Sequence, residues 1–115
     1  MRVRRRFDFE AAHRLPEHPG KCRRLHGHSY ALVVTVEGPI DPQSGMVLDF
    51  AELKRIVKRE IVEQVDHRCL NEIIDNPTAE VVAKWSWERL AAHLPGLVEI
   101  ELRETDRCSA IYRGE

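Results

Sequence analysis

The chain has 115 residues, 43% of them hydrophobic and 32% charged, and its formal net charge at pH 7 is −1. These values are typical of one soluble globular domain covering residues 1–115, and they exclude an intrinsically disordered chain. The balanced charge gives no overall field to attract nucleic acid, and no segment reaches the roughly 18 apolar residues that a membrane-spanning helix needs.

The first half of the chain predicts two long strands. Residues 3–13 and 26–37 both alternate between apolar and polar side chains, which is the pattern of a strand with one buried face. His13 lies on the apolar face of the first strand, and His26 and His28 begin the corresponding face of the second. The segment between the two strands contains two prolines, a glycine and many charges, so it is predicted to be a loop.

The second half predicts two helices followed by two strands. Apolar residues at helical spacing predict a helix over 50–65, and a second helix is expected over 78–93, between an Asn-Pro-Thr start and a Pro-Gly stop. Residues 97–105 alternate as a strand, and residues 109–113 form a short closing strand. The order strand-strand-helix-helix-strand-strand indicates an α+β domain, with a four-stranded antiparallel sheet that carries both helices on one face.

Three histidines form the sharpest chemical signal in the sequence. His26 and His28 are two residues apart in a predicted strand, so both imidazoles point to the same side and can reach one ion. His13 ends the preceding strand and supplies a third ligand if the two strands pair. Three protein ligands around a zinc ion leave the fourth tetrahedral position open, which is typical of a catalytic site. The alternative is that these are ordinary polar side chains beside a loop.

The three cysteines, Cys22, Cys69 and Cys108, are odd in number and have no close pairing, so free thiols are expected. Cys22 lies four residues before His26. It can close the metal site as a fourth ligand, act beside the metal as a thiolate base, or be inert, and the spacing leaves all three interpretations open. No apolar signal segment opens the chain, so a cytoplasmic location is expected.

Three further residues have both a functional and an ordinary interpretation. The pair Asp66-His67 follows the first predicted helix, and a carboxylate that orients an imidazole is a common acid–base arrangement. A polar helix end explains the same pair. Glu104 ends an otherwise apolar strand face, where its carboxylate can accept two hydrogen bonds from a forked donor or can simply be solvated.

Five motifs occur together over nearly the whole chain. They are Phe9-Glu10-Ala11-Ala12-His13-Arg14-Leu15, Cys22 followed after three residues by His26-Gly27-His28-Ser29-Tyr30, Asp66-His67, Pro77-Thr78-Ala79-Glu80, and Glu104-Thr105. In this combination they resemble the 6-pyruvoyltetrahydropterin synthase superfamily. Within it, three residues between the cysteine and the first of the paired histidines are typical of the branch that forms 6-carboxytetrahydropterin for queuosine biosynthesis, whereas pyruvoyl-forming members have five.

The resemblance implies the tunnelling fold (T-fold), in which the four-stranded sheets of neighbouring subunits join into a barrel and active sites lie between subunits. A homo-oligomer is expected, with a hexamer built as a dimer of trimers as the predicted form. The implied substrate is 7,8-dihydroneopterin triphosphate, and the implied products are 6-carboxy-5,6,7,8-tetrahydropterin, acetaldehyde and triphosphate. The implied residue roles are Zn²⁺ binding by His13, His26 and His28, proton transfer by Cys22, Asp66 and His67, and pterin binding by Glu104 and Thr105.

Two other functions would use the same residues. A 6-pyruvoyltetrahydropterin synthase would release triphosphate but no acetaldehyde, and the spacing of Cys22 argues against it. A non-catalytic zinc- or pterin-binding module would not need Cys22, Asp66 and His67 together. The triphosphate requires cationic partners, for which the candidates are Arg23, Arg24, Arg107 and Arg113. No nucleic acid or membrane partner is expected.

Overall fold

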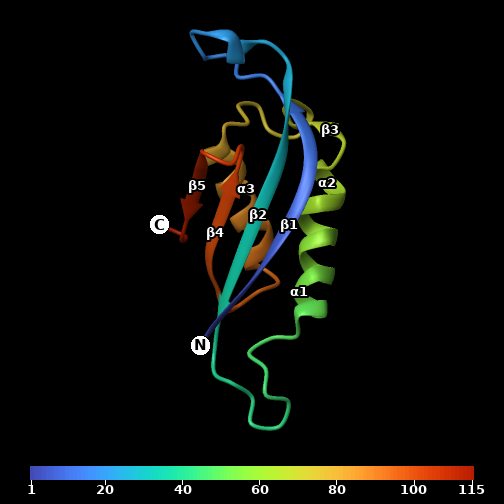
Figure 1. Cartoon of the computed structure of the whole chain (residues 1–115), viewed down its shortest axis with the longest axis vertical. Helices are drawn as coiled ribbons and strands as arrows, with labels where there is room; N and C mark the ends of the chain where they lie inside the picture. The colour runs from blue at the N-terminus through green and yellow to red at the C-terminus, as the bar shows by residue number, and fades with distance from the viewer.

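A computed structural model describes all 115 residues of the chain. A long antiparallel hairpin runs through the middle of the molecule, and the helices lie beside it (Figure 1). In chain order the elements are β1 (Arg2–His13), η1 (Lys21–Arg23), β2 (His26–Glu37), α1 (Phe50–Val57), η2 (Lys58–Val62), α2 (Glu63–Val65), β3 (Arg68–Cys69), η3 (Leu70–Glu72), α3 (Ala79–Ala91), β4 (Leu97–Arg103) and β5 (Ser109–Tyr112). The α+β class predicted from the sequence is therefore confirmed.

The sheet differs from the four-stranded antiparallel sheet that we expected. It has five strands in the order β3-β1-β2-β4-β5, and the short strand β3 pairs in parallel with β1 at Ala11 and Ala12. The other three pairings are antiparallel. A strand also separates the two helical segments, so the order strand-strand-helix-helix-strand-strand was wrong at this point. A two-residue strand carries no detectable alternation, which is why sequence periodicity misses it.

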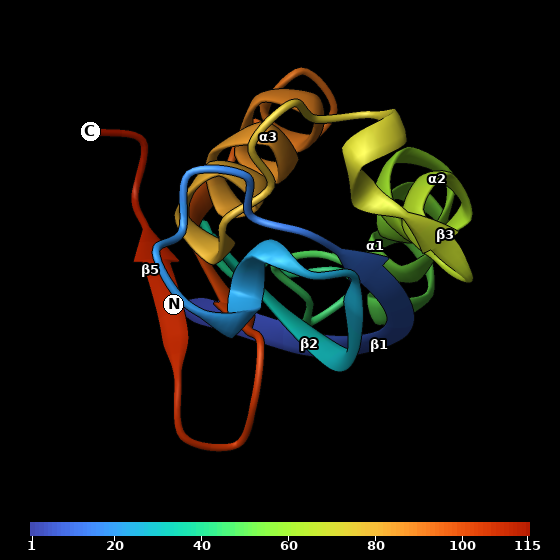
Figure 2. The ribbon, with the colours of Figure 1, turned by 90° about the horizontal axis from the view of Figure 1, so that it is seen from above.

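The helices cover one face of the sheet. Seen from above, α1 and α3 lie on the same side of β1 and β2 (Figure 2). The side chains beneath them alternate along both long strands and join helix residues in one buried cluster, whose largest fully buried members include Tyr30, Leu32, Leu53, Leu90 and Ile100. The opposite face of β1 carries mostly exposed polar residues. The sheet therefore has a helix-covered face and a helix-free face.

Side-chain caps determine where the helices begin. The Asp49 carboxylate accepts a hydrogen bond from the Ala51 amide at 2.8 Å, and the Thr78 hydroxyl accepts one from the Val81 amide at 3.2 Å. Each cap satisfies an amide that the first helical turn leaves without a partner. The predicted helix over 50–65 is one helical run, but its middle, η2, is a π-helical turn. None of the helices is both long and apolar enough to span a bilayer.

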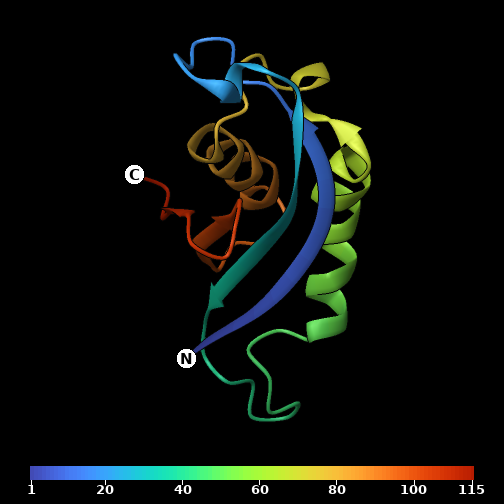
Figure 3. The ribbon, with the colours of Figure 1, turned by 45° about the horizontal axis from the view of Figure 1, so that its top comes forward.

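The register of the hairpin determines what reaches its closed end. In the antiparallel ladder His13 is opposite His26, and Ala11 is opposite His28. Because side chains alternate between faces, all three histidines lie on the helix-covered face. The predicted strand over 97–105 ends earlier, at Arg103 of β4, so Glu104 lies in the turn that follows. Figure 3 shows this end of the hairpin tilted toward the viewer, with the loop over residues 14–25 above it.

Candidate metal centre

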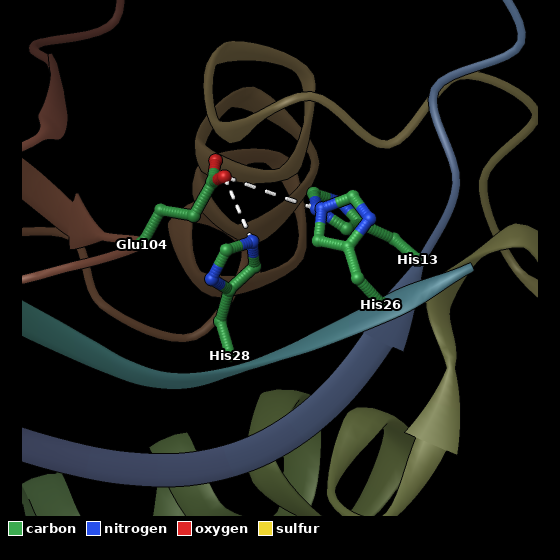
Figure 4. A group of neighbouring side chains, drawn as sticks. All are labelled: His13, His26, His28 and Glu104. Atoms are coloured by element: carbon green, nitrogen blue, oxygen red, sulfur yellow. Dashed lines mark ion pairs between the residues drawn. The ribbon is translucent and has the colours of Figure 1, made fainter. Parts of the chain in front are cut away.

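Four side chains converge at the closed end of the hairpin. His13 comes from the end of β1, His26 and His28 come from the start of β2, and Glu104 comes from the turn after β4 (Figure 4). One nitrogen or oxygen atom from each of the four lies within 4.8 Å of every other. We call this group the histidine–glutamate cluster. The strand pairing expected from the sequence does bring the three histidines together.

Backbone carbonyls orient two of the three imidazoles. Nδ1 of His13 lies 2.8 Å from the carbonyl oxygen of Pro77, and Nδ1 of His26 lies 2.7 Å from that of Arg24. A carbonyl oxygen only accepts, so the proton of each ring is on Nδ1. Nε2 is then left with a free lone pair that points into the cluster. This orientation of a ligand by its other ring nitrogen is typical of histidines that bind metals.

The inward nitrogens have no hydrogen-bond partner in the protein. Nε2 of His13, of His26 and of His28 is buried in each case, and none of them makes a hydrogen bond. A buried polar atom without a partner costs about 1–3 kcal/mol, and three such atoms facing one point are not explained by packing. A cation bound between them satisfies all three. Imidazole nitrogens together with one carboxylate oxygen are ligands that suit Zn²⁺.

The protonation state of His28 also fits a metal ligand. Burial lowers its pKa below the ordinary value of 6.5, and the neighbouring His13 and His26 lower it further, while Glu104 acts in the opposite direction. The ring is therefore neutral at physiological pH, which is the form that binds a metal.

Glu104 takes a different place from the one expected of a solvated strand end. Its Oε1 atom lies 2.9 Å from Nε2 of His28 and 3.8 Å from Nε2 of His13, and its side chain is only 23% exposed. The adjacent Thr105 points elsewhere: its hydroxyl accepts hydrogen bonds from the amides of Arg107 and Cys108, both at 3.2 Å. Thr105 thus holds the turn that presents Glu104.

Cys22 lies beside the cluster without belonging to it. It is half-buried in η1 and lines a cavity of about 350 Å³ together with Lys21, His26 and His28. The four groups that could hold a metal do not include its thiol. Cys69 and Cys108 are also free thiols, as the sequence predicted.

Asp66 and His67 form an ion pair at a different place on the sheet. Nδ1 of His67 lies 3.0 Å from Oδ1 of Asp66, which also accepts a hydrogen bond from the Glu10 amide at 2.9 Å. That amide, followed by His67, lowers the pKa of the Asp66 carboxyl. His67 has φ 59°, the one positive value among the residues other than glycine. This backbone turn lets two neighbouring side chains meet, which an extended strand does not allow.

The Asp66–His67 pair opens toward the helix-free face. His67 lines a depression of about 500 Å³, which His28 and Cys69 also border and whose other walls include Glu10, Ala12 and Ser29. The last three side chains alternate with those of the helix-covered face along β1 and β2, so the histidine–glutamate cluster lies on the other side of the sheet. Within one chain the predicted site residues therefore form two groups, not one.

The candidate arginines for a triphosphate are also distributed between regions. Arg23 lies in η1 and Arg24 follows it, so both are close in sequence to Cys22 and His26. Arg107 lies in the turn after β4. Arg113 lies away from the cluster, where its Nε pairs with Glu99 at 2.9 Å.

Sequence reasoning missed the residues that support the cluster. The Pro77 carbonyl and the Tyr30 hydroxyl, which lies 3.2 Å from Nδ1 of His13, both come from parts of the chain without a local metal signal. Asn71 holds the end of β1 by hydrogen bonds to the amide and the carbonyl of Arg14, each 2.9 Å long. A carbonyl has no sequence signature, and Asn71 resembles any polar loop residue.

The chain resembles known proteins over nearly its whole length. The family described as 6-pyruvoyl tetrahydropterin synthase matches residues 2–115. The chain is 40% identical to a 6-carboxy-5,6,7,8-tetrahydropterin synthase of Synechocystis over 96% of the chain and 91% of that protein, and 43% identical to a dihydroneopterin monophosphate aldolase of Pyrococcus furiosus over 87% and 83%. The structure of the Caenorhabditis elegans 6-pyruvoyl tetrahydropterin synthase is also similar, at 32% identity and a TM-score of 0.92. The match covers 100% of this chain and 96% of that one.

Proposed function

The chain belongs to the 6-pyruvoyl tetrahydropterin synthase family, and from that premise we propose that it is a zinc-dependent 6-carboxytetrahydropterin synthase. The proposed reaction converts 7,8-dihydroneopterin triphosphate and one water into 6-carboxy-5,6,7,8-tetrahydropterin, acetaldehyde and triphosphate, as a step toward queuosine. The relatives are named for different reactions at similar identity, so the choice among reactions rests on residues of this chain.

One observation carries the metal-dependent part of the proposal. Three buried Nε2 atoms, from His13, His26 and His28, face one point and have no hydrogen-bond partner. A zinc ion held there would lower the pKa of hydroxyl groups on a substrate side chain. The pocket beside the cluster, lined by Cys22, is the place where such a side chain would lie.

Cys22 carries the choice among reactions. Three residues separate it from His26, the spacing of the carboxypterin-forming branch. It lies against the cluster but outside the group of possible ligands, which leaves the thiol available for proton transfer. In the proposed mechanism the Cys22 thiolate takes a proton from the substrate side chain.

Asp66 and His67 provide the second proton-transferring group. Asp66 holds the imidazole through Nδ1, so Nε2 of His67 is the atom that exchanges protons. Because the pair opens on the helix-free face, we propose that it serves the site of a neighbouring subunit. This assignment requires a homo-oligomer, and we propose a hexamer built from two trimers. The outer strands β3 and β5 leave unpaired edges through which sheets of neighbouring subunits can join into a barrel.

Glu104 is the proposed anchor of the pterin ring. A carboxylate accepts two hydrogen bonds from the amino group and the N3–H of an amino-pyrimidinone. Thr105 holds the turn that presents Glu104, and we propose that Thr105 also contacts the pterin directly. Arg23 and Arg24, which precede the metal strand, are the proposed partners of the triphosphate.

Product analysis tests the proposal. The zinc-loaded protein is incubated with 7,8-dihydroneopterin triphosphate, and the products are identified by mass. We expect 6-carboxytetrahydropterin and acetaldehyde. Formation of 6-pyruvoyltetrahydropterin without acetaldehyde would support the pyruvoyl-forming alternative. Turnover of dihydroneopterin monophosphate in preference to the triphosphate would support the reaction named for the Pyrococcus relative. Absence of turnover with either substrate would favour the non-catalytic binding module.

A further inference from the structure

We propose that Glu104 is a displaceable fourth ligand of the metal: its carboxylate closes the metal site in the absence of substrate and leaves it when a pterin binds. This inference rests on the proposed function for the identity of the pterin, but its first half concerns the metal alone. Glu104 would bind first the metal and then the pterin ring. Binding of the ring would therefore open one coordination position at the metal.

The distances around Glu104 bracket those expected of ligands around a common centre. Four bonds of about 2.0–2.2 Å in a tetrahedron place neighbouring ligand atoms about 3.3–3.6 Å apart. Oε1 of Glu104 lies 2.9 Å from Nε2 of His28 and 3.8 Å from Nε2 of His13, on either side of that range. The four ligand atoms lie within 4.8 Å of one another.

A direct hydrogen bond does not explain this approach. Nε2 of His28 is close enough to Glu104 for such a bond, yet it makes none. Nε2 of His13, with its proton on Nδ1, offers a lone pair to a carboxylate that also offers lone pairs. Electron-pair donors that face one another at this separation repel unless a cation lies between them. The carboxylate is therefore placed as a ligand and not as a hydrogen-bond acceptor of the imidazoles.

The turn around Glu104 allows its side chain to move while the backbone stays in place. The Glu104 amide donates to the Cys108 carbonyl at 3.1 Å, and the Thr105 hydroxyl accepts from the amides of Arg107 and Cys108. A glutamate side chain has three rotatable bonds, so it can exchange one partner for another without refolding the turn. The histidines lack this freedom because Pro77 and Arg24 hold two of their rings.

The two partners of Glu104 compete for one carboxylate. A metal with four protein ligands has no position for a substrate, whereas three ligands leave one open. An amino-pyrimidinone offers two hydrogen-bond donors that pair well with a carboxylate. If both partners draw on Glu104, the pterin ring must weaken metal binding, and the metal must weaken binding of the ring by the same factor. Full substrate would compensate through its side-chain hydroxyls, which the isolated ring lacks.

The first experiment measures metal affinity without substrate. Zinc affinity is determined by chelator competition for the wild-type protein, for Glu104→Gln and for the control Glu99→Gln. The control removes a carboxylate from β4 that pairs with Arg113, away from the cluster. We expect Glu104→Gln to weaken zinc binding about tenfold or more, since even partners outside the ligand shell contribute roughly 10–100-fold. The visible spectrum of the Co²⁺-substituted protein should change in the same variant and not in the control.

The second experiment uses the wild-type protein alone, so it does not depend on a variant that folds. Unsubstituted pterin is added to the Co²⁺-substituted protein at a concentration that saturates binding by pterin fluorescence. We expect the Co²⁺ spectrum to shift toward that of Glu104→Gln and the zinc affinity to fall.

Equal zinc affinity and equal Co²⁺ spectra in Glu104→Gln and wild type would show that Glu104 is not a ligand and would overturn the proposal. An unchanged spectrum with bound pterin, or tighter zinc binding, would overturn the displacement. Failure of pterin to bind would overturn it as well. Product formation from 7,8-dihydroneopterin triphosphate is measured separately, so a failure of the displacement is distinguishable from a failure of the proposed function.

Discussion

The two faces of the central sheet carry functional groups of opposite character. On the helix-covered face, His13 is fully buried, and the histidine–glutamate cluster is assembled by residues of one chain. On the helix-free face, the His67 side chain is 78% exposed, and Asp66 is its ion-pair partner. The first group contains four possible metal ligands. The second has an oriented imidazole beside the free thiol of Cys69, but none of its residues belongs to the group of possible metal ligands.

This difference predicts which substitutions act within one chain and which act through the oligomer. A buried cluster is shaped by packing, so its geometry exists before any ligand or partner arrives. An exposed pair at the edge of a depression gains a second wall only when another surface covers it. We therefore expect changes on the helix-covered face to act through the single chain, and changes on the helix-free face to act through the assembly.

The largest expected effect is the loss of metal from the buried side. His26→Ala removes one of three oriented nitrogens, and we expect zinc content to fall from about one ion per chain to nearly none. Metal content is measured by elemental analysis after gel filtration. His18→Ala is the matched control, because His18 is a loop histidine whose Nδ1 accepts from the Gly20 amide. Retention of zinc in His26→Ala would remove His26 from the metal site, and loss of zinc in the control would show that the loss is not specific to the cluster.

A further change on the same side separates the metal from proton transfer. Cys22→Ala should keep about one zinc per chain, because the thiol is outside the group of possible ligands. Activity should fall by roughly 10²–10⁴-fold, the usual contribution of a well-placed acid–base group. Zinc content and product formation are measured on the same sample. Loss of zinc in this variant would make Cys22 a ligand and contradict its proposed role.

The comparison between the faces has a direct test in mixed oligomers. Cys22→Ala and His67→Ala are each expected to be nearly inactive. After the two variants are unfolded and refolded together in equal amounts, a site that joins Cys22 of one chain with His67 of its neighbour is intact in about a quarter of cases, half times half. Activity should return to that fraction. If both groups act within one chain, every site in the mixture lacks one of them and no activity returns.

The hairpin and the cluster could be predicted from the sequence more fully than the rest. Alternation along both long strands put His13, His26 and His28 on one face, and a tight antiparallel pairing then had to bring them together. Such periodic signals are local. Three other features depend on contacts between distant segments, so no local sequence pattern predicts them. They are strand β3, the π-helical turn η2 and the positive φ of His67.

The position of Glu104 shows the same limit. Its sequence neighbours predicted a strand end, and the strand was expected to continue through residue 105. The carboxylate reaches the histidines because β4 ends at Arg103 and the following turn closes on Cys108. The sequence also did not predict which side of the sheet Asp66 and His67 face, because their orientation depends on the pairing of β3 with β1.

A moderate effect on stability and on zinc affinity is expected from a change at Asn71, which holds the end of β1. Asn71 joins the segment after β3 to the end of β1 through two hydrogen bonds with the Arg14 backbone. Asn71→Ala removes two exposed hydrogen bonds to the Arg14 backbone, so we expect the free energy of unfolding to fall by about 0.5–1.5 kcal/mol. Zinc affinity should fall with it, because His13 adjoins Arg14. Urea unfolding with and without zinc measures both effects. Unchanged stability would show that water replaces the side chain at this position.

The smallest effect is expected from the charge of Asp66, and it should depend on pH. Asp66→Asn keeps an oxygen that can accept from the Glu10 amide, so it removes mainly the charge. That amide and His67 hold the pKa of the folded Asp66 below its ordinary value of 3.8. A lowered pKa means that the charged carboxylate stabilises the fold above pH 3.8, and that this contribution is lost as the pH falls through the folded pKa.

The wild type should therefore be slightly more stable than Asp66→Asn at pH 7, and the difference should disappear at low pH. The effect is small because the side chain is 37% exposed and solvent screens the pair. Urea unfolding of the metal-free protein between pH 7 and pH 3 measures it, and the same comparison in a His67→Ala background separates the carboxylate from its ion pair with His67. Greater stability of Asp66→Asn than of the wild type at pH 7 would mean that the charged carboxylate destabilises the fold, and that Asp66 is held for His67 at the expense of the fold.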